Sequence, residues 1–206
     1  MRYEDLPFLI NPSLRRLSSP YLQVAWRRID QRMLEHEAGF PAANRAVYTF
    51  QKTVRLLSES SPALLCLYYS DMTDFARLSI QQWLRRQIKS FVEQTASTAL
   101  PLRLHELERQ KGLYCSKVSV FPLKRSILGY CTHTNEIALS PELALFPLRM
   151  SDAVMLHEMA HLKYKHHRKS FWKFLSTLIG EDANEEKYKS DLAYCKHRDM
   201  IEFLME

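Results

Sequence analysis

Val154-Met-Leu-His157-Glu158-Met-Ala-His161-Leu162 is the most informative segment of the chain, because it contains the pattern His-Glu-x-x-His. On an α-helix, residues four positions apart lie about 40° apart around the axis, so His157 and His161 can direct two imidazoles at one metal ion. Glu158 lies about 100° round from His157, within reach of a metal-bound water but poorly placed to be a ligand itself. The pattern therefore predicts a metal site with Glu158 as the general base.

The neighbours of the two histidines predict that this helix is buried on most sides. Met155 and Met159 fall on the face opposite the histidines, and Ala153, Val154 and Ala160 occupy the flanks. An unpaired buried polar group costs roughly 1–3 kcal/mol, and a shared metal ion would give both imidazoles a partner. Imidazole ligands favour Zn2+, and the apolar neighbours argue against the alternative of two solvent-exposed histidines.

A catalytic zinc ion needs a third protein ligand and keeps one position open for water. Four of the eight histidines fall within residues 157–167, which indicates His166 or His167. On a continuous helix His167 would lie about 120° from His161, so the helix must break between residues 163 and 166. The alternative third ligands are two acids further along the chain, Glu181 and Glu185.

The patterns around this segment predict an α+β arrangement of two regions. Residues 1–76 are interpreted as a helical N-terminal region, with helices at 20–38 and 42–58, and a further one or two helices are expected over 62–99. Residues 77–206 are interpreted as the domain that carries the metal site. Within it, the spacing of apolar residues predicts strands at 117–121, 126–132 and 136–140 and helices at 101–111, 151–161, 171–179 and 181–206.

Composition and charge limit the class of protein. Of the 206 residues 46% are hydrophobic, enough for a core, and the net charge of +6 comes from a mixture of both signs, which excludes a disordered polyelectrolyte. The four cysteines form no CxxC pair, which excludes a disulfide-dense scaffold. No stretch approaches the ~18–20 apolar residues of a membrane helix, so we expect a cytoplasmic protein without membrane contact. The small basic excess does not by itself predict nucleic-acid binding.

Five blocks of residues occur in the order in which a known family has them. They are Trp83-Leu-Arg-Arg86, Leu128-Gly-Tyr-Cys131, Ile137-Ala-Leu-Ser-Pro-Glu-Leu143, His157-Glu-Met-Ala-His161-Leu162 and His167-Arg-Lys-Ser-Phe171-Trp172. With these blocks, residues 78–178 resemble the YgjP-like zinc-dependent hydrolases, which are predicted metallopeptidases. The resemblance implies a zincin-like domain over residues 77–206 that binds Zn2+. It also implies that His167, and neither of the two acids, is the third ligand.

The chain departs from the family at three positions that we expect to line the site. Leu128 and Tyr130 replace the family's Trp and Ser, and Ser140 replaces an Asn. Substrate preference can therefore differ from that of other members. The strand-rich N-terminal half that is usual in the family is not evident in residues 1–76.

The predicted reaction is hydrolysis by a metal-activated water, with a peptide or protein as the first substrate class. This choice rests on Ile137–Ser140, which we interpret as an edge strand able to pair with an extended chain. One alternative is a nucleotide phosphoanhydride, held by the basic residues Lys163, Lys165, Arg168, Lys169 and Lys173. A second alternative is a non-catalytic, metal-stabilised adaptor. The sequence leaves the oligomeric state open.

Several other side chains near the pattern have simpler interpretations. Tyr130 and Tyr164 can each donate a hydrogen bond to an oxyanion, although ordinary packing is the preferred interpretation for both. Phe171 and Trp172 are interpreted as core residues that hold the segment after His167 in place.

Overall fold

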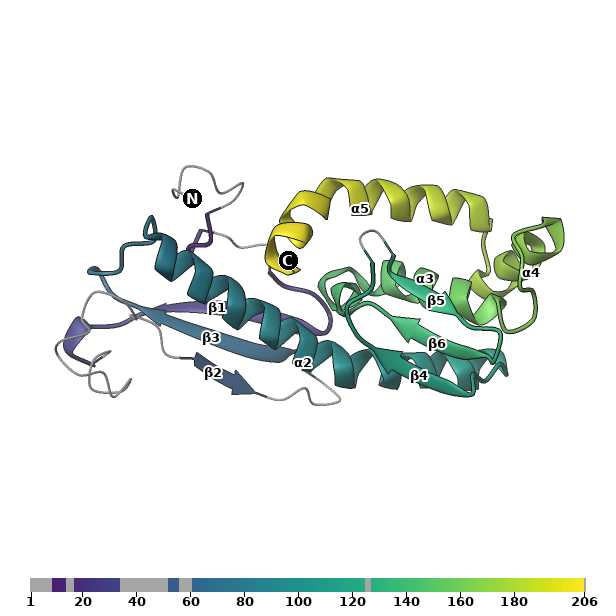
Figure 1. Cartoon of the computed structure of the whole chain (residues 1–206), viewed down its shortest axis with the longest axis horizontal. Coiled ribbons are helices and arrows are strands. Elements are labelled where there is room, and N and C mark those ends of the chain that lie inside the picture. Colours follow the sequence, from purple (N-terminus) through teal and green to yellow (C-terminus); the bar gives the residue numbers. More distant parts are fainter. Residues whose placement is uncertain (1–8, 14–16, 34–51, 56–60, 125–126, 206) are drawn as a thin grey trace.

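Two small sheets and a long helix determine the architecture. The computed structural model describes residues 9–13, 17–33, 52–55, 61–124 and 127–205. Within them, two three-stranded sheets lie beside each other along the long axis of the molecule, and helix α2 (Leu78–Lys111) passes both (Figure 1). The predicted α+β class is confirmed.

The first sheet corrects the prediction of a helical region over residues 1–76. Its strands are β1 (Leu22–Arg28), β2 (Lys52–Arg55) and β3 (Ala63–Tyr69). The order is β1-β3-β2, with β1 parallel and β2 antiparallel to the central β3. The predicted helices over 20–38, 42–58 and the start of 62–99 are therefore wrong at the three strands, whereas residues 31–33 are helical as predicted. Much of the segment 34–60 lies outside the described residues.

The central position of β3 explains why its apolar sequence does not show the alternation that predicts a strand. The strand reads Ala-Leu-Leu-Cys-Leu-Tyr-Tyr, a continuous apolar run, and Leu65 and Leu67 are fully buried. A central strand covered on both faces has no alternation of apolar and polar residues, so spacing alone does not distinguish it from a buried helix. Pairing with both neighbours, which are distant in sequence, makes this segment a strand.

Helix α2 continues through Pro101, where a new helix was predicted to begin. A proline inside a helix costs about 3 kcal/mol, because it lacks an N–H and crowds the preceding turn. The buried face runs on without interruption through Leu100 and Leu104, so packing offsets that cost. The helix ends as predicted at Gly112, which has φ 67° and donates its N–H to the carbonyl of Glu108.

The second sheet contains the three predicted strands. They are β4 (Lys117–Val120), β5 (Gly129–Cys131) and β6 (Glu136–Leu139). The order is β4-β6-β5, with β4 parallel and β5 antiparallel to β6. The interpretation of Ile137–Ser140 as an edge strand is wrong, because β6 is paired along both sides. The strand at the edge beside the helix with the His-Glu-x-x-His pattern is β5.

Four further elements complete the domain. After the 3-10 helix η3 (Pro141–Leu145) come α3 (Leu148–Ala160), α4 (Lys169–Ile179) and α5 (Ala183–Met205). Helix α3 packs against β5, α4 and α5, and α5 lies across it on the side away from α2 (Figure 1). The core is continuous from the first sheet to α5. None of the described helices is long and apolar enough to cross a membrane.

Candidate metal centre

The end of α3 places His157 and His161 on one side of the helix. The helix ends at Ala160, ahead of the break that was predicted at residues 163–166. There the amides of His161 and Leu162 donate to carbonyls three residues back, at 3.1 and 3.0 Å, which tightens the last turn. The chain then reverses direction and brings His167 back toward the helix before α4 begins.

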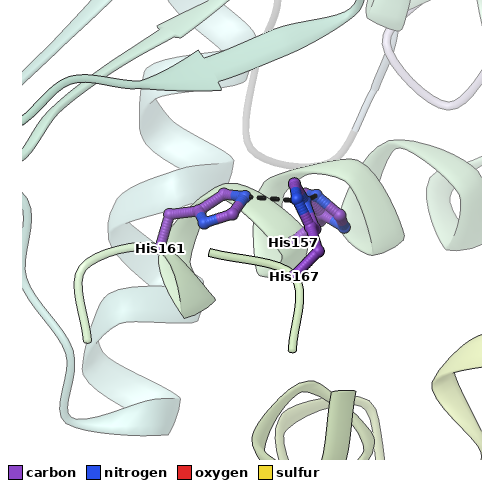
Figure 2. Close-up of side chains that lie close together, drawn as sticks. All are labelled: His157, His161 and His167. Atoms are coloured by element: carbon purple, nitrogen blue, oxygen red, sulfur yellow. Dashed lines mark hydrogen bonds between the residues drawn. The ribbon is translucent and has the colours of Figure 1, made fainter. Parts of the chain in front are cut away.

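Three imidazoles converge at this reversal. Nε2 of His167 lies 3.0 Å from Nε2 of His157 and 3.1 Å from Nε2 of His161 (Figure 2). Zn–N bonds of 2.0–2.1 Å in a tetrahedral site place two donors about 3.3 Å apart, so the spacing suits such an ion. Among the His, Cys, Asp and Glu side chains of the described residues, His157, His161 and His167 form a group whose ligand atoms all lie within 4.8 Å of one another, close enough to hold one metal ion.

Hydrogen bonds and ring contacts hold the imidazoles in this orientation. The Nδ1–H of His161 donates to the carbonyl of Tyr164 at 2.8 Å, which leaves Nε2 with a lone pair directed at the other two rings. The ring of Phe171, fully buried, stacks on His161 at 4.6 Å between centroids. Trp172 donates its indole N–H to the carbonyl of His167 at 3.0 Å. Phe171 and Trp172 therefore hold the segment as predicted.

The electrostatics of the site favour neutral imidazoles. Burial, together with the neighbouring His161, His167 and Lys187, lowers the pKa of His157 to about 4. Burial also lowers the pKa of His161. Metal binding requires the unprotonated ring. The three imidazole nitrogens at this spacing fit a divalent metal ion.

Glu158 lies beside the imidazoles in a nearly dry position. Its side chain is buried, with 6% of the residue exposed, and burial raises the pKa of its carboxyl to about 7, against the effect of a hydrogen bond from the backbone N–H of Cys131. A buried carboxyl with a pKa near neutrality can both accept and release a proton under ordinary conditions.

Gly129 makes room for this carboxyl and was not singled out from the sequence. A Cβ at this position would lie 3.0 Å from Cγ and 3.4 Å from Oε1 of Glu158. A glycine in the short strand opposite the His-Glu pair was the available signal, because close approach of another group is a common reason for glycine in a strand.

A cavity of about 300 Å³ opens beside His157 and Glu158. Its walls come from the segment before β5 and from α3, α4 and α5. His157 and Glu158 therefore border a space large enough for a side chain of a bound molecule.

The alternative ligands lie elsewhere. Glu181 pairs with Arg149 at 2.7 Å, and Glu185 pairs with Lys189 at 2.8 Å. His166 is turned away from the three imidazoles, and its Nδ1 accepts from the backbone N–H of Arg168 at 3.3 Å. Neither acid belongs to the converging group.

Two of the predicted phosphate-binding lysines contact the protein itself. The ammonium of Lys163 lies over the rings of Tyr164 and Phe174. Lys165 donates to the carbonyl of Thr132 at 2.6 Å and to the side chain of Asn135 at 2.8 Å. The hydrogen bonds of Lys165 connect the loop between His161 and His167 to the β5–β6 turn.

Ordinary packing, the preferred interpretation for Tyr130 and Tyr164, is confirmed for Tyr164 and wrong for Tyr130. Tyr130 is exposed on β5. The ring of Tyr164 packs on Phe174, while its carbonyl orients His161.

Comparison with known proteins gives one match. A family model described as the YgjP-like metallopeptidase domain matches residues 22–190. No curated protein and no solved structure matches the chain. The match begins at β1, so it extends well beyond residues 78–178 and includes the first sheet. The prediction that the family's strand-rich N-terminal part is absent is therefore wrong.

Proposed function

The chain belongs to the YgjP-like metallopeptidase-domain family, a family of metal-dependent hydrolases, and from this premise we propose that it is a zinc peptidase. His157, His161 and His167 would hold the metal ion, and Glu158 would be the general base. The observation that supports this most directly is the convergence of three imidazole nitrogens beside a buried carboxyl at the wall of a cavity.

The donor set fits zinc, because it offers three imidazole nitrogens and would leave a fourth position for water. When bound, Zn2+ would supply Lewis acidity that polarises the scissile carbonyl and lowers the pKa of coordinated water to about 7. The protein supplies orientation: the carbonyl of Tyr164 fixes the ring of His161, and Phe171 and Trp172 fix the approach of His167.

Glu158 would transfer the proton from the attacking water to the leaving amine. With a pKa near 7 its carboxylate accepts a proton from the attacking water and, once protonated, delivers it to the leaving amine. The N–H of Cys131 holds the carboxylate in one orientation and keeps it partly ionised despite burial.

A peptide substrate is supported by the position of β5, which is an edge strand of the second sheet in the part of the chain that the structure describes. The backbone N–H of Cys131 bonds Glu158 rather than β6, so the outer edge of this strand faces the reacting groups. An extended peptide that added to this edge would lie with its backbone beside Glu158. Because Lys163 and Lys165 contact other groups of the protein, they are less available to hold phosphates, and the phosphoanhydride alternative has less support.

The test compares zinc-loaded wild type with Glu158→Gln on an unstructured protein and on nucleoside triphosphates. We expect peptide-bond cleavage by the wild type and a loss of about 10²–10⁴-fold in the variant, with zinc content unchanged. Turnover of nucleotides alone would remove the peptidase proposal. Full biological activity of the variant with zinc bound would favour the adaptor alternative.

A further inference from the structure

The cavity beside the reacting groups has mainly apolar walls. Leu128 lines it ahead of β5, Val154 lines it on α3, and Leu175 and Ile179 line it on α4. Helix α5 closes the remaining side with residues spaced three and four apart, which share one helix face. These are Ala183, Glu186, Lys187, Ser190 and Asp191.

The charged groups on this wall are paired with one another or with close neighbours. Glu186, of which 3% is exposed, accepts from Nε of Arg149 at 3.1 Å with both carboxylate oxygens. Lys187 forms an ion pair with Asp191 one turn further along α5. The wall charges are thus neutralised locally, and a charged group entering the cavity would have to displace one of these pairs.

We propose that this cavity is a specificity pocket for a single large apolar side chain, of the leucine, methionine or phenylalanine class, next to the scissile bond. This proposal rests on the proposed peptidase function. An apolar cavity of about 150 Å³ already holds a benzene ring, so 300 Å³ accommodates one such side chain. Its position beside both His157 and Glu158 places the neighbouring backbone carbonyl at the reacting groups.

Helix α5 limits the size of this pocket from one side, while the apolar walls come from the segment before β5 and from α3 and α4. It contributes residues of one helix face to the wall. Ser190 lies half-buried in this wall, so a larger side chain there would fill the pocket without changing a reacting group.

The first test is the cleavage profile of zinc-loaded protein on a mixture of unstructured peptides. We expect one position next to the cleaved bond to be enriched at least about tenfold in leucine, methionine and phenylalanine over aspartate and lysine. Cleavage without any apolar preference would overturn the pocket and leave the peptidase function standing.

The second test separates the two proposals by binding alone. Amino-acid hydroxamates, which chelate zinc through the same group, are titrated against the zinc-loaded protein. We expect the leucine and phenylalanine compounds to bind at least about tenfold more tightly than the glycine and aspartate compounds. The pocket would stand on this result even if no peptide were cleaved, and equal binding of all four would overturn it.

A variant at Ser190 of α5 tests whether the apolar side chain binds in this cavity. Ser190→Trp fills the pocket and should reduce the binding of the phenylalanine hydroxamate to the level of the glycine compound, with zinc content and helix content unchanged. Leu192→Trp adds the same side chain two residues away, at an exposed position outside the cavity, and should bind like wild type. Equal behaviour of the two variants would contradict the assignment to this face.

Discussion

Two buried glutamates on two different helices show what distinguishes a reactive carboxyl from a structural one. Glu108 on α2 and Glu158 on α3 are 4% and 6% exposed, and each has a histidine on the same helix. Burial raises the pKa of both carboxyls. At Glu108, hydrogen bonds from His105 and from Cys115 outweigh burial, and the pKa falls below its ordinary value. At Glu158 burial dominates, and the pKa rises to about 7.

The difference lies in what surrounds each carboxylate. Glu108 accepts from Nδ1 of His105 at 2.6 Å and from the N–H of Cys115 at 2.7 Å, so it ties the end of α2 to the loop that follows. Glu158 accepts from Cys131 and borders the cavity. With similar exposed fractions, the two carboxyls therefore differ in pKa, which is lowered at Glu108 and raised at Glu158, according to the number of donors and the depth of burial around each.

The largest expected effect comes from making the two helices alike. His161→Arg converts the pattern on α3 to that of His105-Glu-Leu-Glu-Arg109 on α2. Removing a ligand whose Nε2 lies 3.1 Å from that of His167 should weaken zinc binding by more than about 100-fold. Competition with a chromophoric chelator measures this affinity.

Arg109→His is the reciprocal change, because it creates a second His-Glu-x-x-His on α2. We expect no second zinc equivalent, since Nδ1 of His105 is held by Glu108 and the described residues offer no third imidazole there. Two equivalents of zinc would show that the helical pattern alone is sufficient.

Removing the charge from the structural carboxyl should destabilise the protein without affecting the reaction. Glu108→Gln weakens two hydrogen bonds to a buried group and should cost about 1–3 kcal/mol in the free energy of unfolding, measured by urea denaturation. Cleavage by the folded variant should match wild type. An activity loss as large as that of Glu158→Gln would remove the distinction between the two sites.

Two glycines allow a smaller comparison of the same regions. Gly129→Ala places a Cβ 3.0 Å from Glu158 Cγ and should lower activity about tenfold by displacing the carboxylate, with little change in zinc affinity. Gly112→Ala meets no atom within 4 Å but has φ +67°, so it should cost about 1 kcal/mol of stability and leave activity unchanged. Wild-type activity in Gly129→Ala would show that the carboxylate does not need this space.

The smallest expected effect is on the free energy of unfolding at acidic pH. Because the folded-state pKa of Glu108 lies below its ordinary value of 4.5, its contribution is complete above that pH and is lost as the pH falls through the folded-state value. The stability difference between wild type and Glu108→Gln should therefore be constant near neutrality and shrink below about pH 4.5. A difference that grew on acidification would reverse the assigned sign.

The spacing of residues close in the chain was enough to predict the helices around the site and where they end. The spacing of His157 and His161 placed both on one side of α3, and Gly112 and Gly180 ended α2 and α4 as expected, each with positive φ. These features depend on helix geometry and on backbone conformations that glycine adopts easily, which are properties of neighbouring residues.

Long-range pairing settled the features that the sequence pattern did not reveal. The apolar run of β3 became a strand because β1 and β2 pair with it, and β6 became central because β4 and β5 take both of its sides. The pKa of Glu158 and the approach of His167 depend on Cys131, Phe171 and the cavity wall, which only packing brings together. Helix spacing is encoded within a few residues, whereas strand partners, burial and charge are set by groups far apart in the chain, so the first could be read from the amino acids and the second required the folded molecule.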